Sequence, residues 1–201
     1  MKNKILSIVA SALVFASLST TAFASTTVKN TNKIGDVMTE EQEKISANFL
    51  EKHPDLVSKY NKLKNAKIQE ADSSMHIESP AAPLTDYYTY FVAYNYDSSD
   101  ETISNYEIVT DEITTENDFN GTIYVGTVEI GYGTEYANFN GDNLSKYDIV
   151  LLDFDGDNII DGFIDVWKID NVTSGKFSSN ATSTNYNPNH TAPFYTGINI
   201  Q

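Results

Sequence analysis

Apolar residues recur at two different spacings along the chain, and each spacing predicts a different kind of element. Over residues 39–67 they fall three or four positions apart, which is the period of an amphipathic helix. From residue 86 onward, short aromatic and β-branched runs alternate with turn residues, which is typical of β-strands. The chain is therefore expected to form a short helical hairpin followed by a β domain.

The helical stretch carries its own start signals. Thr39-Glu-Glu-Gln42 matches a capping box, and Pro54 suits the first position of a second helix. Two helices are predicted, at about 39–52 and 54–67. We expect their apolar stripe to pack on the rest of the chain, and a propeptide or a flexible interaction arm is the alternative.

The β pattern begins near Asp86, where alternate positions from Tyr88 to Tyr96 are expected to share one strand face. Asn120-Gly121 and Asn140-Gly141 are two-residue turn signals. Further strands are predicted at 103–110, 122–131, 149–154, 160–169, 175–183 and 194–200. Seven or eight short strands predict a mainly β fold, an antiparallel β-sandwich or a barrel-like domain.

The N-terminus has the composition of a secretory signal peptide. A basic start precedes an apolar run from Ile5 to Leu18, and Ala22-Phe-Ala24 supplies a small-residue cleavage site. The run is too short to span a membrane, so a secreted, extracellular protein is expected. The predicted division is a signal peptide at 1–24, a helical segment at 25–67, a linker at 68–85 and an acidic β domain at 86–201. Few contacts are expected to cross the linker, which contains Pro80 and Pro83.

Charge is concentrated in the β domain. The whole chain has a net charge of −15, and residues 86–201 hold 19 acidic residues against 3 Lys. Such a domain is not expected to bind nucleic acid or an anionic membrane. The absence of Cys excludes disulfides and Cys-ligated metal. The sequence does not indicate an oligomeric state.

The most specific chemical pattern is the stretch from Asp153 to Asp161. Calcium prefers six to eight oxygen ligands, and carboxylates at positions 1, 3 and 5 of a tight loop converge on one point. Asn158 stands where the turn needs a positive φ, which Asn tolerates. The predicted calcium ligands are Asp153, Asp155, Asp157, the carbonyl of Ile159, and Asp161. A plain solvated turn is the alternative, since Asp, Gly and Asn are ordinary turn residues.

This loop resembles the calcium loops of thrombospondin type 3, dockerin and integrin FG-GAP repeats, although it occurs only once here. It departs from the EF-hand because Ile164 stands at position 12, where a bidentate Glu is required. Asp165 comes one place too late and, in an extended strand, lies too far from Asp161 to share an ion with it.

The β domain also resembles a small secreted bacillar family typified by YolA. The likeness rests on Glu129-Ile-Gly-Tyr-Gly133, Thr173-Ser-Gly-Lys-Phe177, Thr182-Ser-Thr-Asn185 and Ile198-Asn-Ile200. It covers roughly residues 86–201. The resemblance implies a compact secreted β domain and carries no activity.

Candidate catalytic residues are few. None of His53, His76 and His190 has zinc-site spacing, and a Ser–His–Asp set using His190 lacks a nucleophile elbow. A pair of carboxylates drawn from Glu107, Glu129 and Glu135 is the candidate for acid–base hydrolysis. The alternative is that these strand residues face solvent.

Three hypotheses follow. The first is a secreted non-catalytic β module, stabilised by calcium, that contacts a cell-wall, polysaccharide or protein partner through surface Tyr residues. The second is a small secreted hydrolase using paired carboxylates. The third is a secreted inhibitor or toxin-like effector with a helical prosegment. A pocket holding two of the three Glu residues would favour the second, and an exposed row of Tyr would favour the first.

Overall fold

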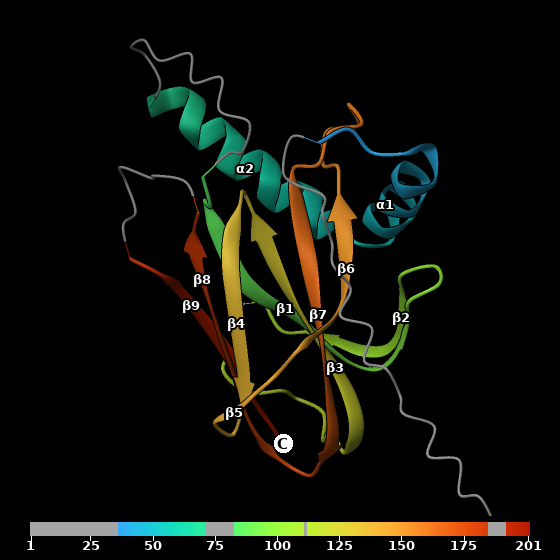
Figure 1. The fold of residues 1–201 in the computed structure, drawn as a ribbon, viewed down its shortest axis with the longest axis vertical. Helices are drawn as coiled ribbons and strands as arrows, with labels where there is room; N and C mark the ends of the chain where they lie inside the picture. The colour runs from blue at the N-terminus through green and yellow to red at the C-terminus, as the bar shows by residue number, and fades with distance from the viewer. Residues whose placement is uncertain (1–35, 71–82, 111, 185–191) are drawn as a thin grey trace, which may run out of the picture.

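A computed structural model describes residues 36–70, 83–110, 112–184 and 192–201 (Figure 1). The predicted signal peptide at 1–24 and residues 71–82 of the predicted linker lie outside the described residues. The elements are helices α1 (Glu40–Lys52) and α2 (Pro54–Glu70) and strands β1 (Asp86–Asp97), β2 (Thr102–Ile108), β3 (Gly121–Ile130), β4 (Gly133–Phe139), β5 (Asp142–Asn143), β6 (Lys146–Leu152), β7 (Gly162–Val172), β8 (Gly175–Ser183) and β9 (Phe194–Ile200).

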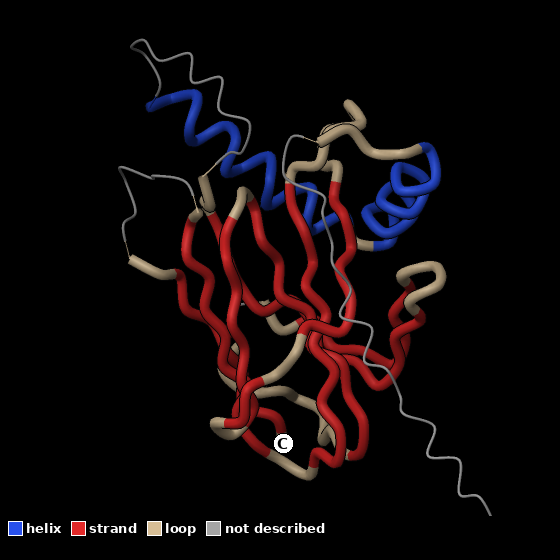
Figure 2. The backbone as a smooth tube through the Cα atoms, viewed as in Figure 1, coloured by secondary structure: helices blue, strands red, loops and turns tan. Residues whose placement is uncertain are grey.

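The strands form two antiparallel sheets that face each other, with both helices at one end of the molecule (Figure 2). The five-stranded sheet has the order β2-β1-β3-β7-β6, and the four-stranded sheet has the order β5-β4-β8-β9. The predicted fold, a mainly β antiparallel sandwich preceded by a helical pair, is confirmed.

Each face of the five-stranded sheet has its own apolar core. Val125 and Trp167 point toward the four-stranded sheet and pack with Phe177 and Ile198. The other face carries Val128 and Ile164, because successive strand residues point to opposite sides. This second face packs against the helices.

The helix signals have the predicted effect. Thr39 and Gln42 form the reciprocal capping box, and Pro54 opens α2, which extends three residues beyond the predicted end. Phe49, Leu50 and Leu56 are buried in the core between the helices and the sheet. The expected packing of the apolar stripe is therefore observed, and the expectation of few contacts between the helices and the β domain is wrong.

The predicted alternation of β1 is also wrong beyond its first residues. A bulge between Thr89 and Phe91 shifts the register of β1 against β3. Tyr88 and Tyr90 pack on the helix side, whereas Val92 packs between the sheets. A bulge inserts one extra residue and so reverses the faces that follow it.

The Asn140-Gly141 turn is where the sequence predicted it, between β4 and β5, with φ of 53° and 93°. Strands β4 and β5 themselves were not predicted. Neither described helix combines the length and the apolar character needed to cross a membrane.

Candidate active site

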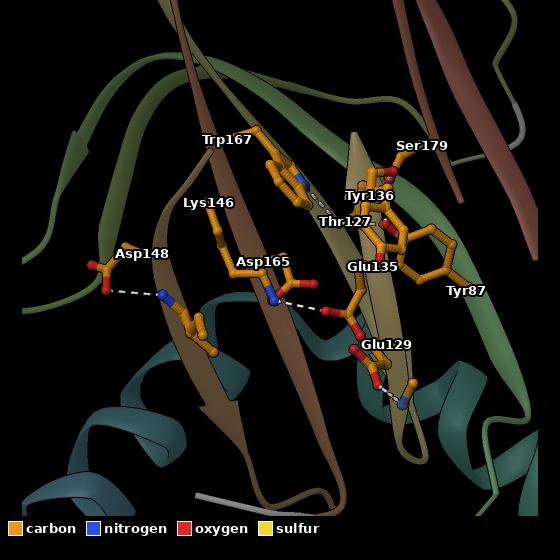
Figure 3. A network of polar contacts seen from close by, with 12 residues as sticks. Tyr87, Thr127, Glu129, Glu135, Tyr136, Lys146, Asp148, Asp165, Trp167 and Ser179 are labelled. Carbon is orange, nitrogen blue, oxygen red and sulfur yellow. Dashed lines mark hydrogen bonds and ion pairs between the residues drawn. The ribbon is translucent and has the colours of Figure 1, made fainter. Parts of the chain in front are cut away.

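Four ionisable side chains converge between the two sheets (Figure 3). Glu129 comes from β3, Lys146 from β6 and Asp165 from β7, all in the five-stranded sheet, while Glu135 comes from β4 in the facing sheet. We call these four residues the charged cluster. It joins residues that lie up to 36 positions apart in the chain.

Strand alternation explains why Glu129 and Asp165 face inward. Glu129 stands two positions after Thr127 on β3, and Asp165 stands two positions before Trp167 on β7. Residues two apart share a strand face, so both carboxyls point with Thr127 and Trp167 toward the four-stranded sheet. Lys146 reaches the same space because β6 has a register shift between Lys146 and Asp148. The shift puts these two residues on opposite faces.

Lys146 links the two sheets by ion pairs. Its Nζ lies 2.8 Å from Oε2 of Glu135 and 2.7 Å from Oδ1 of Asp165. The Asp165 side chain is only 1% exposed. Its second oxygen, Oδ2, is buried and has no hydrogen-bond partner among the described residues. Two carboxyls therefore share one cation, and one oxygen of Asp165 has no partner among the described residues.

Glu129 is the member best placed to keep a proton. Burial raises its pKa well above the usual range, and a hydrogen bond with Glu135 raises it further. Its Oε1 also accepts a hydrogen bond of 2.5 Å from the backbone N–H of Gly133. Glu129 therefore keeps its proton to a higher pH than an ordinary carboxyl does, and it stands beside the carboxyl that is paired with Lys146.

The other two charges are also perturbed. Burial raises the pKa of Asp165 to about 7, and contact with Lys146 limits that rise. Burial alone would lower the pKa of Lys146, but Asp165 and Glu135 outweigh it and raise the pKa. Clusters of shifted pKa values of this kind are characteristic of functional sites.

A pocket of about 150 Å³ opens beside the cluster. It is lined by Glu129, Tyr132, Gly133, Glu135, Lys146, Ile149 and Phe163. The pocket thus presents an acid, a carboxylate and an ammonium group on apolar walls. Concave sites with a few convergent polar groups are the usual place for small-ligand chemistry.

Neutral hydrogen bonds fix the strands next to the cluster. Trp167 Nε1 donates to Thr127 Oγ1 at 2.9 Å, and the Tyr87 hydroxyl donates to the same oxygen at 3.3 Å. Tyr87 also contacts Ser179 Oγ at 2.5 Å, and Ser179 donates to the carbonyl of Tyr136 (Figure 3). This chain of contacts connects both sheets and limits their relative movement.

The acidic loop lies elsewhere, at the helix end of the sandwich. Carboxylate oxygens of Asp153, Asp155 and Asp161 lie within 4.8 Å of one another, whereas Asp157 is not part of this group. Ile159 forms an antiparallel bridge with Val37. Three predicted carboxylate ligands are thus brought together, and Asp165 belongs to the charged cluster instead.

Protein groups already contact the loop carboxylates. Asp153 accepts three backbone N–H groups, from residues 156–158, and Asn158 has a φ of 67°, as the sequence predicted. Helix α2 supplies Lys64, 2.8 Å from Asp155, and Tyr60, whose hydroxyl lies 3.0 Å from Asp161. Lys64 thus takes the position of a counter-charge.

The other candidate catalytic residues, Glu107 and the three His, do not join the charged cluster within the described residues. Glu107 lies outside the charged cluster. Its side chain accepts hydrogen bonds from the backbone N–H groups of Glu116 and Asn117. His53 is buried between α1 and β1, with Nδ1 3.0 Å from the Tyr90 hydroxyl. His76 and His190 lie outside the described residues.

A protein-family model described as a domain of unknown function (DUF4879) matches residues 79–200. The chain belongs to the DUF4879 family. The match covers the whole sandwich, including the charged cluster and the acidic loop. No curated protein and no solved structure matches the chain. The resemblances to YolA and to calcium-loop repeats stay predictions.

Sequence reasoning found half of the cluster in this DUF4879 chain. It selected Glu129 and Glu135, but it missed Lys146 and placed Asp165 only by exclusion from the calcium loop. The sequence gives no signal that separates Lys146 from the other two Lys of the β domain, Lys168 and Lys176.

Proposed function

We propose that this DUF4879 protein is a small secreted hydrolase in which Glu129 and Glu135 form the acid–base pair. The observation that carries the proposal is the pocket, which places Glu129, whose pKa is raised by burial, beside Glu135, which is paired with Lys146. A pocket holding two of the three candidate Glu residues was the feature that would favour a hydrolase over a non-catalytic module.

Each residue of the cluster has a chemical role in this reaction. The Glu135 carboxylate takes a proton from water, and the water oxygen attacks the electrophilic carbon of the substrate. Glu129 gives its proton to the leaving group as the bond between that group and the attacked carbon breaks. Lys146 holds the Glu135 side chain in place through the ion pair of 2.8 Å.

The energetics of the cluster support a functional role. Burying ion pairs costs desolvation energy, and well-packed apolar residues are often as stable or more stable at such positions. Here the cluster also leaves Oδ2 of Asp165 without a partner among the described residues. The apolar cores can hold the sandwich together without a buried charged cluster. A catalytic role therefore explains the cluster better than a contribution to stability does.

The spacing of the carboxyls indicates the bond that is cleaved. Paired carboxyl groups of glycosidases stand about 5–5.5 Å apart or farther. Carboxyl oxygens of Glu129 and Glu135 lie within 4.8 Å of each other, which is closer than that. Carboxyls that share a proton are the arrangement of acid peptidases. We therefore expect hydrolysis of an amide bond rather than a glycosidic bond.

The test uses the mature chain from residue 25 and substrates that report each bond class separately. Labelled casein and peptidoglycan are incubated with the protein, and new amines and new reducing ends are measured. We expect new amines, with the rate reduced about 10²–10⁴-fold in Glu129→Gln and Glu135→Gln.

Glu107→Gln is the matched control, because Glu107 lies on β2 of the five-stranded sheet and outside the pocket. It should keep the full rate. Release of reducing ends alone would overturn the bond class. Equal rates in all three variants, or no cleavage of either substrate, would overturn the hydrolase.

Secretion and calcium remain part of the proposal. The signal-peptide pattern supports export, and the converging carboxylates of the acidic loop support a stabilising calcium ion outside the active site. Such an ion would compete with Lys64 for Asp155. It would act on stability and take no part in hydrolysis.

A further inference from the structure

The outer face of the four-stranded sheet carries a row of polar and aromatic side chains. Tyr136 on β4 pairs with Asn180 on β8, which in turn pairs with Tyr195 on β9. Tyr136 and Tyr195 are 65% and 75% exposed, the highest values for any tyrosine among the exposed large hydrophobic residues. On the other face of the same sheet, Ala137 of β4 and Phe177 of β8 point inward to the core.

A groove of about 520 Å³ runs along this face. It is lined by Glu112, Ile113, Asn138, Lys176, Ser178, Ser179, Asn180, Tyr195, Thr196, Gly197, Ile198 and Asn199. We call it the outer groove. Its volume falls within the range typical of ligand sites.

One wall of the outer groove is built outside the named strands. Asn199 donates its backbone N–H to the carbonyl of Ile113 at 2.9 Å, and Thr115 donates to the carbonyl of Asn199 at 2.9 Å. The segment before β3 therefore runs beside β9 and raises Ile113, which is 78% exposed, above the floor. On the floor, Gly197 lets β9 approach β8 closely, because a Cβ there would lie 2.5 Å from the carbonyl oxygen of Phe177.

The lining has almost no net charge. Its charged residues are one Lys and one Glu, Lys176 and Glu112, on a protein with a net charge of −15. The field of the whole molecule repels anionic polymers, and a cationic ligand would find stronger sites elsewhere. This surface therefore suits an uncharged ligand better than a charged one.

The side chains of the lining define the ligand further. Amide and hydroxyl groups of Asn138, Ser178, Asn180 and Asn199 both donate and accept hydrogen bonds, which suits a ligand rich in hydroxyl groups. Tyr195 in the lining, and Tyr136, which lies outside the lining but pairs with Asn180, offer flat apolar faces with a polar tip. Tyr136 and Tyr195 are two strand spacings apart, or about 10 Å, so a chain laid across the strands would contact both.

From this charge balance and chemistry we propose that the outer groove binds a neutral polysaccharide. The site lies on the opposite side of the four-stranded sheet from the charged cluster. The inference does not rest on hydrolysis, because binding is measured without turnover. Tyr136, Asn180 and Tyr195 are the residues expected to supply most of the affinity.

The test is affinity electrophoresis and calorimetry of the mature chain with soluble glucan, mannan and xylan, and with polygalacturonate as the anionic comparison. At least one neutral polymer should bind, and polygalacturonate should not. Tyr195→Ala and Tyr136→Ala should each weaken binding at least tenfold. Tyr195→Phe, which keeps the ring, should stay within about threefold of the native chain.

Tyr106→Ala is the matched control, because Tyr106 is a 43% exposed strand Tyr of the other sheet. It should bind as the native chain does, and so should Glu135→Gln. Unchanged melting temperatures establish that the groove variants are folded. The proposal is overturned if none of the neutral polymers binds, if polygalacturonate binds equally well, or if the groove variants match Tyr106→Ala.

Discussion

Lys146 Nζ lies 2.8 Å from Glu135 Oε2 on the facing sheet, so one ion pair crosses the interior of the sandwich. The same ammonium group contacts Asp165, which is 1% exposed. Removing the cation would therefore leave two buried carboxyls without compensation. Several consequences of this geometry can be measured.

Lys146→Met should destabilise the protein by about 3–5 kcal/mol, which is typical when one partner of a buried ion pair is removed. The loss should be larger at pH 8 than at pH 5, because protonation relieves the carboxyls left behind. Urea unfolding at the two pH values measures it. Lys168→Met is the control, since the pair of Lys168 with Asp170 is exposed and worth about 1 kcal/mol or less. Equal effects of the two substitutions would contradict a buried pair.

Stability should fall as the pH rises from about 4 to about 7. Burial raises the pKa of Asp165 and of Glu101 to about 7, and that of Glu129 rises as well. Between the unfolded and folded pKa values the folded state holds protons that the unfolded state has released, so each pH unit costs about 1.4 kcal/mol per group.

His53 acts in the opposite direction, because burial lowers its pKa and its contribution is lost as the pH falls below about 6.5. The carboxyls outnumber it, so the melting temperature is expected to be higher at pH 5 than at pH 7.5. Asp165→Asn should flatten this dependence. A melting temperature that rises over the same interval would show that the carboxyls are not held in their protonated form.

Calcium should stabilise the protein through Asp153, Asp155 and Asp161. An ion at a hundred times its Kd adds about 2.7 kcal/mol to the free energy of unfolding, and chelator should remove the gain. Asp155→Asn should weaken the effect. Lys64→Met should strengthen it, because Lys64 competes with the ion for Asp155.

Lys62→Met serves as the control for Lys64→Met, since Lys62 is an exposed residue of the same helix. It should leave the calcium response unchanged. A melting curve that responds to neither calcium nor chelator would show that the acidic loop is a plain turn, held by α2 rather than by an ion.

Leu56→Ala should lower the stability of the whole molecule by about 2–5 kcal/mol, as large-to-small substitutions in cores do. Leu56 is 1% exposed and lies in the core shared by the helices and the five-stranded sheet. The single Trp, Trp167, lies between the sheets and reports on the β domain alone. The shift should therefore appear in Trp fluorescence during urea unfolding. An unchanged Trp transition would show that the helical segment folds independently.

Local signals of the sequence predicted local structure well. The capping box at Thr39, the positive φ at Asn158 and the Asn140-Gly141 turn all depend on the chemistry of a few adjacent residues. Strand β4 was missed because Gly133-Thr-Glu-Tyr-Ala-Asn-Phe139 contains several poor strand formers. Pairing with β8 stabilises this strand, and that partner lies about 40 residues away.

The charged cluster could be predicted only in part for a similar reason. Glu129 and Glu135 were selected by residue type, but their contact depends on two sheets packing face to face. Lys146 points inward because of a register shift in β6, and no sequence pattern marks that shift. Bulges also reversed the expected faces of β1. Alternation alone therefore fails wherever an extra residue enters a strand.

Glu135 and Tyr136 are neighbours in the chain, yet one enters the sandwich interior and the other lies on the outer face of the same sheet. Strand β4 is thus a partition between two chemical environments. Inserting or deleting one residue in the part of β4 before Glu135 would exchange the faces of the strand positions that follow. The carboxylate and the aromatic ring would then be lost from their places together, so a length change at the start of β4 alters both environments.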